Sequence, residues 1–446
     1  MHLLALVIAL AAAPAAEPAV RSPVSPDESL QHFVLSPELE LRIDFVAAEP
    51  EVIDPVAIAF DEQARMYVVE MRDYPNGPAE GQPPTSRVKL LEDTDGDGRF
   101  ETAHVFADGL LFATGVLPWD GGAIVTVAGE VRFLKDTDGD HRADVNEVWF
   151  RGFSEGNPQL RANHPTLGPD GKIYVANGLR GGKVQAVKPG WPQTEIELRD
   201  HDFRFDPRTG AAEAVAGGGQ FGLTFDAFGN RFICSNRNPC DHVVLELDEI
   251  ERNPHLAIGR SVQVVAAAGD DSRVFPLVDA WTTSTLHAGQ FTAACGVKIF
   301  TGDALPQECV GNAFTCEPTG SLVHREVLEP VGGTFRGTPG ETNAEFLASR
   351  DPWFRPVNLA VGPDGALYVV DMYRAVIEHP EWMPEELRTR RDLRWGDDRG
   401  RIYRVAAKDR PPGRMRPPAD EAARDDRLRR LRRFTTTAER LGTDEG

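Results

Sequence analysis

The sequence predicts an all-β fold, namely a six-bladed β-propeller followed by a short helical C-terminal tail. A unit of strand, turn and strand recurs along the chain, and the clearest copies are joined by Gly-Pro-Asp-Gly turns. The 42 glycines and 34 prolines also suit an architecture rich in turns. The repeats fall at residues 56–71, 115–129, 166–178, 222–236 and 358–372, with a more divergent copy at 294–318.

Six repeats predict six blades, because one strand pair can bury its apolar faces only against the neighbouring repeats. The repeats recur at intervals of roughly 50–75 residues, which fits blades with long loops between their strands. A two-sheet sandwich would not explain the recurrence. We expect the segment around residues 401–405 to complete a blade beside the N-terminal strand and so leave no exposed sheet edge.

The N-terminal end of the chain differs in composition from the repeats. Residues 1–16 predict a signal peptide, because the apolar run at residues 3–13 leads into an Ala-Pro-Ala cleavage pattern. We therefore expect export to the periplasm or the extracellular space, with an uncleaved anchor as the alternative. No stretch of the chain is long and apolar enough to predict a transmembrane span.

The remaining chain divides into a linker, the propeller and a tail. Residues 17–35 are polar and contain proline, so they predict a linker, and residues 36–407 predict the propeller. Residues 408–446 are rich in proline and arginine and place Leu428, Leu431 and Phe434 at helical spacing. This partly helical tail is either a solvated basic helix or the start of a further helical domain.

The charge balance of the chain limits its partners. The 69 aspartates and glutamates against 48 lysines and arginines give a formal net charge of -21. Such a surface repels phosphate backbones and anionic lipids, so we do not expect binding to nucleic acid or to membrane surfaces. A small-molecule or carbohydrate ligand, neutral or cationic, is the better prediction.

The five cysteines fall in one stretch of the chain, at positions 234, 240, 295, 309 and 316. Export would permit disulfides, and a bond between Cys295 and Cys316 would join two neighbouring strands. A bond between Cys234 and Cys240 would close a tight loop and leave Cys309 free, although spacing alone does not establish connectivity. Buried free thiols are the alternative. No Cys-x-x-Cys motif occurs, so a covalent c-type haem is not expected in this chain.

Two acidic loops, DTDGDGRFE at 93–101 and DTDGDHRAD at 136–144, predict calcium sites. Calcium prefers several oxygen ligands, which carboxylates at alternating loop positions supply. We expect strand-loop-strand sites rather than helix-loop-helix ones, and hairpin turns with solvated acids are the alternative. The predicted ligands are Asp93, Asp95, Asp97 and Glu101 in the first loop and Asp136, Asp138, Asp140 and Asp144 in the second.

A set of polar residues occurs at equivalent ends of the repeat strands, which converge in space in a propeller. Asn163 and His164 precede the strand of the third repeat, where a histidine facing the channel could act as a base near neutral pH. A hydrogen-bonded structural histidine and a solvated rim of ion pairs are the alternatives. The other members are Glu70, Arg72, Tyr74, Asn236, Arg237, Arg355, Asp371, Tyr373 and Arg374.

Several segments together resemble a known family over about residues 36–405. They are similar to the N-terminal propeller of planctomycete-type membrane-bound dehydrogenases, also called haem-binding CxxCH proteins. That propeller is more distantly similar to the soluble quinoprotein glucose and sorbosone dehydrogenases. The segments are MYVVEMRDYP, KLLEDTDGDGRFE, FLKDTDGDHRAD, ANHPTLGPDGKIYVANG, FGLTFDAFGNRFICSN, GNAFTCEPTGSLVHR, VDMYRAVIEHP and DRGRIYRV.

The resemblance implies a catalytic base and a quinone cofactor. Through the pattern His-x-x-Leu-Gly-Pro-Asp-Gly, His164 matches the base that takes the substrate hydroxyl proton in the quinoproteins. Arginines hold pyrroloquinoline quinone there, and Arg355 lies in a segment similar to one that provides such an arginine. At residues 217–223 this chain has GGGQFGL where the quinoproteins carry an arginine. A cytochrome is the implied electron acceptor, because full-length relatives continue into a CxxCH domain.

Taken together, these features predict an exported oxidoreductase-like propeller that oxidises a sugar or alcohol hydroxyl. His164 would remove the proton, and Arg72, Arg237 and Arg355 would offset negative charge on the cofactor or on the developing alkoxide. Asn163, Asp371, Tyr373 and Arg374 complete the predicted cofactor site. A non-catalytic propeller that binds glycans or a partner is the first rival, and a calcium-stiffened structural domain is the second.

Overall fold

The computed structural model describes residues 20–410, apart from 158, 254, 256, 280–286 and 384. The predicted signal peptide at 1–16 and the predicted tail from 411 onward lie outside the described residues. Within the described residues strands predominate, and none of the helices is long and apolar enough to cross a membrane. The α-helices are α1 (Pro26–Ser29), α2 (Leu247–Glu251) and α3 (Glu385–Arg388), and the short 3-10 segments are Leu30–His32, Gly269–Asp271, Gln307–Cys309 and Pro380–Trp382.

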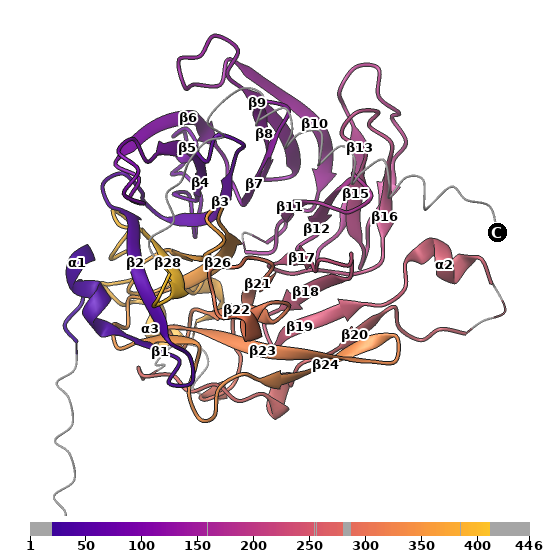
Figure 1. Cartoon of the computed structure of the whole chain (residues 1–446). Helices are drawn as coiled ribbons and strands as arrows, with labels where there is room; N and C mark the ends of the chain where they lie inside the picture. The colour runs from indigo at the N-terminus through magenta and orange to yellow at the C-terminus, as the bar shows by residue number, and fades with distance from the viewer. Residues whose placement is uncertain are drawn as a thin grey trace, which may run out of the picture.

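The strands form six antiparallel blades around a central axis, as the repeats predict (Figure 1). Blade 1 contains β3 (Pro55–Phe60), β4 (Met66–Glu70), β5 (Ser86–Glu92) and β6 (Thr102–Leu110). Blade 2 contains β7 (Gly115–Trp119), β8 (Gly122–Val127), β9 (Glu130–Lys135) and β10 (Val145–Phe153). Blade 3 contains β11 (Asn163–Leu167), β12 (Ile173–Ala176), β15 (Asp202–Phe205) and β16 (Ala212–Val215).

The second half of the ring repeats this arrangement. Blade 4 contains β17 (Leu223–Phe225), β18 (Arg231–Ser235), β19 (Asn238–Val243) and β20 (Val262–Val264). Blade 5 contains β21 (Cys295–Ile299), β22 (Ala313–Glu317), β23 (Leu322–Val331) and β25 (Leu347–Ser349). Blade 6 contains β26 (Pro356–Val361), β27 (Leu367–Asp371), β28 (Arg401–Ala407) and β2 (Leu41–Ala48).

Four further strands extend two of the blades. The strands β13 (Gly182–Ala186) and β14 (Ile196–Glu197) add to the outer edge of blade 2, and β24 (Thr334–Pro339) forms a hairpin with β23. The strand β1 (Phe33–Leu35) pairs with β25 at the edge of blade 5. Residues 26–35, within the segment predicted as a linker, therefore form α1, a 3-10 turn and β1, with Phe33 packed edge-to-face against Phe354 and Tyr403.

The ring closes in blade 6, where the two ends of the propeller meet. The N-terminal β2 pairs with the C-terminal β28, and Arg401 lies opposite Ala48 in the register. This confirms the prediction that the segment around residues 401–405 completes a blade beside the N-terminal strand. Because one blade combines both chain ends, separation of blades 6 and 1 would require breaking this strand pair.

The Gly-Pro-Asp-Gly turns of the third and sixth repeats share one geometry. Gly171 and Gly365 adopt φ values of +74° and +79°, a region that glycine enters without steric penalty. In each repeat the turn aspartate accepts a hydrogen bond from a tyrosine on the following strand, Tyr174 to Asp170 at 3.0 Å and Tyr368 to Asp364 at 3.2 Å. The sequence motif therefore specifies both the turn and a side-chain contact that holds it.

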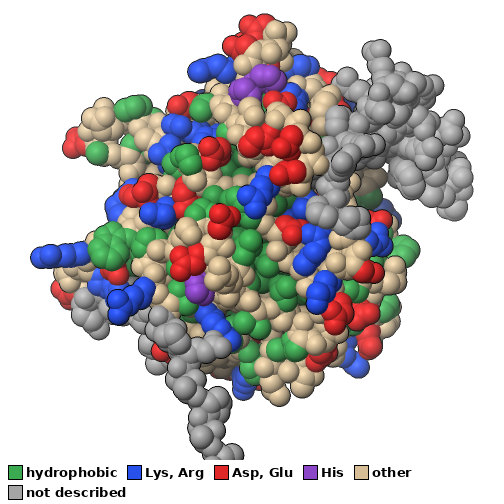
Figure 2. Space-filling view, turned by 60° about the vertical axis from the view of Figure 1, so that its left-hand side comes forward, with side chains coloured by type: hydrophobic (Ala, Val, Ile, Leu, Met, Phe, Trp, Pro, Cys, Tyr) green, Lys and Arg blue, Asp and Glu red, His purple; other side chains and the backbone are tan. Residues whose placement is uncertain are grey.

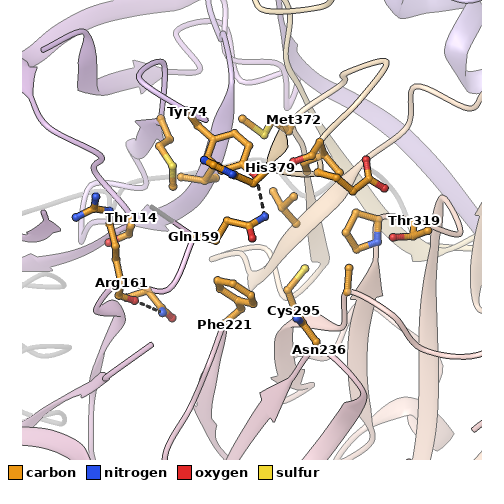
Figure 3. Close-up of a pocket in the computed structure, with 18 of the residues that line it drawn as sticks. Tyr74, Thr114, Gln159, Arg161, Phe221, Asn236, Cys295, Thr319, Met372 and His379 are labelled. Atoms are coloured by element: carbon orange, nitrogen blue, oxygen red, sulfur yellow. Dashed lines mark hydrogen bonds between the residues drawn. The ribbon is translucent and has the colours of Figure 1, made fainter. Parts of the chain in front are cut away.

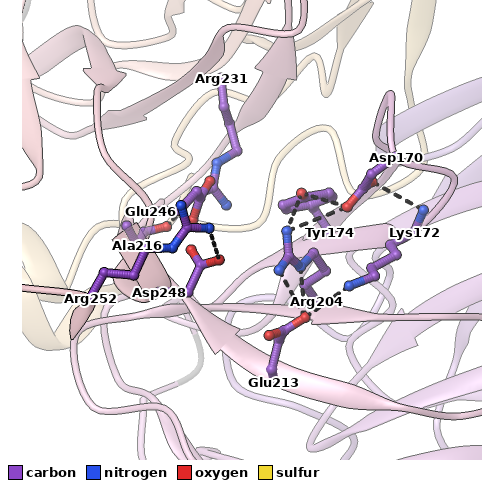
Figure 4. A network of polar contacts seen from close by, with 10 residues as sticks. All are labelled: Asp170, Lys172, Tyr174, Arg204, Glu213, Ala216, Arg231, Glu246, Asp248 and Arg252. Atoms are coloured by element: carbon purple, nitrogen blue, oxygen red, sulfur yellow. Dashed lines mark hydrogen bonds and ion pairs between the residues drawn. The ribbon is translucent and has the colours of Figure 1, made fainter. Parts of the chain in front are cut away.

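Polar networks hold the outer parts of blades 3 and 4 (Figure 4). Arg204 on β15 donates to the hydroxyl of Tyr174 and to Glu213, both at 2.8 Å. Arg231 on β18 pairs with Glu246 at 2.8 Å.

Figure 2 shows acidic and basic side chains interspersed over one face of the molecule, with hydrophobic patches between them.

All five cysteines are buried free thiols in the structure. Cys295 and Cys316 lie opposite each other on the neighbouring strands β21 and β22, as expected, but the predicted disulfide between them is not formed. The predicted bond between Cys234 and Cys240 is not formed either. These side chains lie in the apolar clusters of blades 4 to 6, where burial raises the pKa of each thiol and so disfavours the reactive thiolate.

Candidate functional site: a cavity at the start of the inner strands

A cavity of about 280 Å³ lies at the end of the central channel where the six inner strands begin. Each blade lines it with a residue from the start of its inner strand or from the two positions before that strand. The repeats predict this convergence, because equivalent strand ends meet around the axis of a propeller. The six residues are Val56, Thr114, His164, Phe221, Cys295 and Val357.

Loop residues cover the cavity on the side away from the strands (Figure 3). Gln159 lies between Tyr74 and Phe221 and donates to the Tyr74 hydroxyl at 2.8 Å. The Tyr74 hydroxyl in turn donates to the carbonyl of Ile377 at 2.7 Å. This chain of hydrogen bonds ties loops of blades 1, 2 and 6 together across the mouth of the cavity.

Buried carboxylates fix the segments that lead into the inner strands of blades 1, 5 and 6. Each carboxylate ends the second strand of its blade and accepts backbone N–H groups just before the inner strand. Burial raises the pKa of both Glu317 and Asp371 to about 7, although these hydrogen bonds oppose the shift. The bonds run from Ile53 to Glu70 at 2.9 Å, from Thr292 and Ala293 to Glu317 at 2.9 Å, and from Arg355 to Asp371 at 2.8 Å.

His164 lines the cavity from an irregular part of β11. Its φ of +50° lies in the left-handed region, which is unusual for a residue with a side chain, and the pairing of β11 with β12 is irregular at this point. Burial lowers the pKa of His164 to about 4, and the nearby charge of Lys298 acts in the same direction. The ring is therefore neutral at pH 7.

The hydrogen-bond distances around His164 favour one tautomer of its neutral ring. The amide nitrogen of Asn163 donates to the carbonyls of Arg161 and Gln220, both at 2.8 Å, so the Asn163 oxygen is turned to the histidine. That oxygen lies 2.8 Å from Nδ1 of His164. An amide oxygen only accepts, and this contact is shorter than the 3.2 Å contact of Nε2 with the Asn358 oxygen, so the geometry favours the tautomer with the hydrogen on Nδ1 and a lone pair on Nε2.

The Nε2 atom of His164 also faces an amide oxygen. The amide nitrogen of Asn358 donates to the carbonyl of Val56 at 3.0 Å, and its oxygen accepts from the backbone N–H of Leu359 at 2.8 Å. This oxygen lies 3.2 Å from Nε2. In the neutral ring two acceptors therefore face each other, and a proton that reached Nε2 would find a hydrogen-bond partner already in place.

The lining carries one guanidinium and one carboxylate with unused hydrogen-bonding capacity. Nε and Nη1 of Arg161 are buried and have no hydrogen-bond partner among the described residues, while the guanidinium stacks on Phe112 with 4.3 Å to the ring centroid. Burial lowers the pKa of Arg161, and Glu155 at 3.8 Å opposes this only in part. Both carboxylate oxygens of Glu378 are likewise buried without a partner in the described part of the chain. Because Arg161 and Glu378 are both lining residues, one donor-bearing and one acceptor-bearing side chain border the cavity.

Of the seven predicted cofactor residues, only Asn163 lines the cavity. Arg374 forms a buried two-point ion pair with Asp54, at 2.6 and 2.7 Å. Arg355 donates to the carbonyls of Pro318, Arg374 and Ala375.

The remaining members of the predicted cofactor set also have partners inside the protein or lie outside the lining. Tyr373 donates to Asp351 at 2.7 Å, and Arg237 pairs with Asp270 at 2.7 Å. Asp371 holds the backbone of blade 6, as described above. Arg72 is partly buried and is not part of the lining.

The first acidic loop brings three of its four predicted ligands together. One oxygen from each of Asp93, Asp95 and Glu101 lies within 4.8 Å of the others. Burial and the neighbouring negative charges raise the pKa of Asp93, although it accepts backbone N–H bonds from Gly96 and Gly98. Asp97 instead accepts from the backbone of Arg99 at 2.7 Å.

The second acidic loop brings together Asp136, Asp138 and Asp140, again within 4.8 Å. Backbone N–H bonds from Gly139 and His141 outweigh burial and lower the pKa of Asp136. Asp144 accepts from the hydroxyl of Thr137 at 2.6 Å and is not part of the converging set. Both loops thus gather an all-oxygen donor set of the kind that calcium prefers.

Sequence reasoning missed several lining residues with polar groups, namely Gln159, Arg161, Glu378 and His379. Two signals could have found them. Gln159 and Arg161 lie four and two residues before Asn163, and Glu378 and His379 lie near the end of the segment VDMYRAVIEHP, which runs on from the last repeat.

Comparisons with known proteins give a family and a set of distant likenesses. The family described as "Domain of unknown function (DUF7133)" matches residues 25–409. No curated protein matches the chain. Among solved structures, an oxidoreductase (glucose dehydrogenase) of Thermus thermophilus is 19% identical with a TM-score of 0.44, and the match covers 82% of this chain and 99% of that one.

Two further solved structures show the same degree of similarity. The soluble aldose sugar dehydrogenase of Escherichia coli is 11% identical with a TM-score of 0.43, covering 82% of this chain and 99% of that one. The aldose sugar dehydrogenase of Streptomyces coelicolor, in a form with bound pyrroloquinoline quinone, is 13% identical with a TM-score of 0.44, covering 83% and 99%.

Proposed function

The chain belongs to the family described as a domain of unknown function (DUF7133), and we propose that its axial cavity binds a small uncharged molecule with hydroxyl groups, such as a sugar or an alcohol. In this proposal Nε2 of His164 accepts a hydrogen bond from a ligand hydroxyl, and it would take the proton only if a hydride acceptor were also bound. The single observation that carries it is a neutral, partly buried histidine in a cavity whose guanidinium and carboxylate have atoms without partners among the described residues.

The size and polarity of the cavity support a small polyol. At about 280 Å³, the cavity is near the lower end of the roughly 300–1,000 Å³ range of small-molecule sites. Arg161 supplies donors and Glu378 supplies acceptors, and a hydroxyl group can satisfy either. A ligand with several hydroxyl groups would pair both, whereas an apolar ligand would leave both unpaired at a cost in free energy.

The two asparagine partners of His164 support its role as an acceptor toward a ligand hydroxyl. Asn163 keeps the hydrogen on Nδ1, so the lone pair of Nε2 is available to a hydroxyl. When Nε2 takes the proton, the oxygen of Asn358 accepts a hydrogen bond from it and stabilises the imidazolium. Without that partner, burial alone would oppose the charged ring still more strongly.

Oxidation of the hydroxyl to a carbonyl would also need an acceptor for the hydride, and pyrroloquinoline quinone is the cofactor expected from the resemblance. That quinone carries three carboxylates. The lining offers the guanidinium of Arg161 to them, and the carboxylate of Glu378 would repel them. The lining residues therefore do not fit this cofactor, and we derive no step through it. A role for Arg72, Arg237 and Arg355 in holding it stays a prediction.

Titration of the calcium-supplemented full chain tests the proposal. We expect saturable heat with at least one member of a panel of monosaccharides, polyols and short alcohols. Arg161→Leu should weaken this binding roughly 10–100-fold, because it removes hydrogen bonds from a charged donor. The matched control is Arg260→Leu at an exposed position. Equal binding by Arg161→Leu, or no binding to any panel member, would overturn the proposal.

Quinone titration separates a dehydrogenase from its binding-only rival. We expect no absorbance change with micromolar pyrroloquinoline quinone in the presence of calcium. If the quinone did bind, and a panel member then reduced an artificial electron acceptor, the dehydrogenase function would stand. In that case His164→Gln should lower turnover roughly 10²–10⁴-fold, as expected for the loss of a positioned base.

The two acidic loops are proposed to bind calcium and so to stabilise blades 1 and 2. A ligand that binds only the folded state raises the thermal midpoint by mass action. We expect calcium to raise the midpoint and the change Asp95→Asn/Asp97→Asn to remove most of the rise. The change Asp138→Asn/Asp140→Asn shows how much of the rise in the thermal midpoint comes from the second loop. An identical melting curve with chelator and with excess calcium would exclude this role.

A further inference from the structure

Outside the cavity, two histidines and a glutamate lie together where blade 1 meets the second acidic loop. One ligand atom from each of Glu92, His104 and His141 lies within 4.8 Å of the others. Nε2 of His104 is 3.6 Å from Oε2 of Glu92, and the two imidazole rings stack with 4.4 Å between their centroids. All three residues are partly buried, and none belongs to the two predicted sets of calcium ligands.

The fold brings these residues together through strand register. Glu92 ends β5 and lies opposite Thr102 on β6, and His104 follows two residues later on β6. Side chains two residues apart on a strand point to the same face, so Glu92 and His104 form a diagonal pair on blade 1.

The loop of blade 2 places His141 beside this pair. The backbone N–H of Ala143 donates to the carbonyl of Phe106 on β6 at 2.7 Å, which fastens the loop to blade 1. Asp136 accepts the backbone N–H of His141 at 2.8 Å, and His141 adopts a φ of +67°. The position of the imidazole is therefore set by the backbone on both sides of it.

The chemistry of the cluster does not match that of a structural ion pair. Nδ1 of His141 is buried and has no hydrogen-bond partner within the described ranges of the chain. At 3.6 Å, the contact between His104 and Glu92 is too long for a hydrogen bond. Two imidazoles and one carboxylate thus converge without satisfying one another.

We propose that Glu92, His104 and His141 bind a divalent transition-metal ion of the zinc class. Imidazole nitrogen suits zinc, copper and nickel, whereas calcium prefers oxygen ligands, so this site differs in kind from the adjacent acidic loops. Zinc bonds of about 2.0–2.2 Å place ligand atoms roughly 3–4 Å apart, so the three side chains must move closer together. The two stacked imidazoles must also rotate so that their in-plane lone pairs converge on one ion. Water would complete the coordination, because three protein ligands leave a position open.

The bound ion would join blade 1 to blade 2. Two of its ligands belong to the β5–β6 hairpin, and the third belongs to the loop between β9 and β10. Because none of the three lines the axial cavity, the metal would stabilise the propeller without contacting a ligand bound beside His164.

Zinc titration of the untagged, chelator-treated full chain tests this site, with excess calcium present to occupy the acidic loops. We expect one equivalent of Zn²⁺ by calorimetry and, with Co²⁺, visible absorption bands of low coordination number. His104→Ala and His141→Gly should each weaken binding by at least the roughly 10–100-fold that loss of even an outer-shell partner costs. Zinc should raise the thermal midpoint of the unchanged protein but not of either variant.

His141→Gly is the variant that separates metal binding from folding. Gly98 takes the corresponding place in the first acidic loop at a φ of +91°, and glycine adopts positive φ more readily than histidine. This variant should therefore fold at least as well as the unchanged chain without metal. The control is His255→Ala at an exposed position. Equal zinc affinity in His141→Gly, displacement of zinc by calcium, or no zinc binding at all would each overturn the proposal.

Discussion

Two histidines of this protein, the partly buried His164 and the buried His324, have nearly the same hydrogen-bond geometry and opposite protonation. The ring nitrogens of His164 lie 2.8 and 3.2 Å from the side-chain oxygens of Asn163 and Asn358. Those of His324 lie 2.7 and 3.2 Å from the carboxylates of Glu345 and Glu326. Geometry alone therefore does not distinguish a proton acceptor from a structural cation.

The charge of the partners makes the difference. Burial opposes the charged form of both rings, and it lowers the pKa of His164 to about 4 because amide oxygens compensate only weakly. At His324 the carboxylates of Glu345 and Glu326 outweigh burial and raise the pKa to about 10. A neutral histidine beside a cavity can take up a proton, whereas a histidine held between two carboxylates is already protonated.

The largest expected effect concerns stability. His324→Gln leaves two buried carboxylates without a cation and should lower the free energy of unfolding by about 3–5 kcal/mol. His164→Gln, its matched control, leaves only neutral amides and should cost about 1–3 kcal/mol. Urea unfolding at pH 7 measures both. A loss for His164→Gln equal to that for His324→Gln would show that the partner charges do not govern these sites.

Exchanging the partners should exchange the behaviour of the two rings. Glu345→Gln removes one carboxylate and should lower the pKa of His324 by roughly 1–3, while Asn358→Asp should raise that of His164 by a similar amount. Histidine ring signals followed by NMR across pH report both values. Asn358→Asp also loses the hydrogen bond to the carbonyl of Val56, so the thermal midpoint of this variant is measured in parallel to detect any loss of stability. Shifts in the same direction would contradict the comparison.

The two histidines should also give opposite slopes of stability with pH. The pKa of His324 is raised, so its contribution is complete below its ordinary value of 6.5 and is lost as the pH rises toward about 10. The pKa of His164 is lowered, so the stability associated with its neutral ring is present above 6.5 and is lost as the pH falls toward about 4. Each slope is at most about 1.4 kcal/mol per pH unit.

Unfolding curves of the unchanged chain and the two glutamine variants isolate these slopes. The difference in the free energy of unfolding between the unchanged chain and His324→Gln should become smaller from pH 7 to pH 9. The same difference between the unchanged chain and His164→Gln should become smaller in the opposite direction of pH, from pH 7 to pH 5. A difference that does not vary with pH in either pair would show that the corresponding ring does not change protonation on folding.

The smallest expected effect concerns Lys298. Its positive charge contributes to the low pKa of His164 but ranks below burial among the causes. Lys298→Met should therefore raise the pKa of His164 by less than Asn358→Asp does. NMR titration of the same ring compares the two variants. A larger rise with Lys298→Met would mean that charge repulsion, rather than burial, keeps the ring neutral.

Local sequence was sufficient to predict the six blades, the closure of the ring and the convergence of strand ends at the cavity. The signals for these features lie within single repeats, such as the Gly-Pro-Asp-Gly turns at 168–171 and 362–365. The arginines predicted for the cofactor show the limit of that reasoning. Arg374 is paired with Asp54, which is 320 positions away in the chain, and no local pattern indicates such a partner.

By itself, then, the sequence determined the architecture, the acidic loops and His164 as a residue at the inner end of its blade. The tertiary structure alone decided which side chains line the cavity and which histidine is neutral. The partner of Nε2 of His164 is Asn358, 194 positions along the chain, and the cluster of Glu92, His104 and His141 forms only when two blades meet. The physical reason is that burial and partner charge, which set protonation and metal affinity, arise from contacts between distant segments.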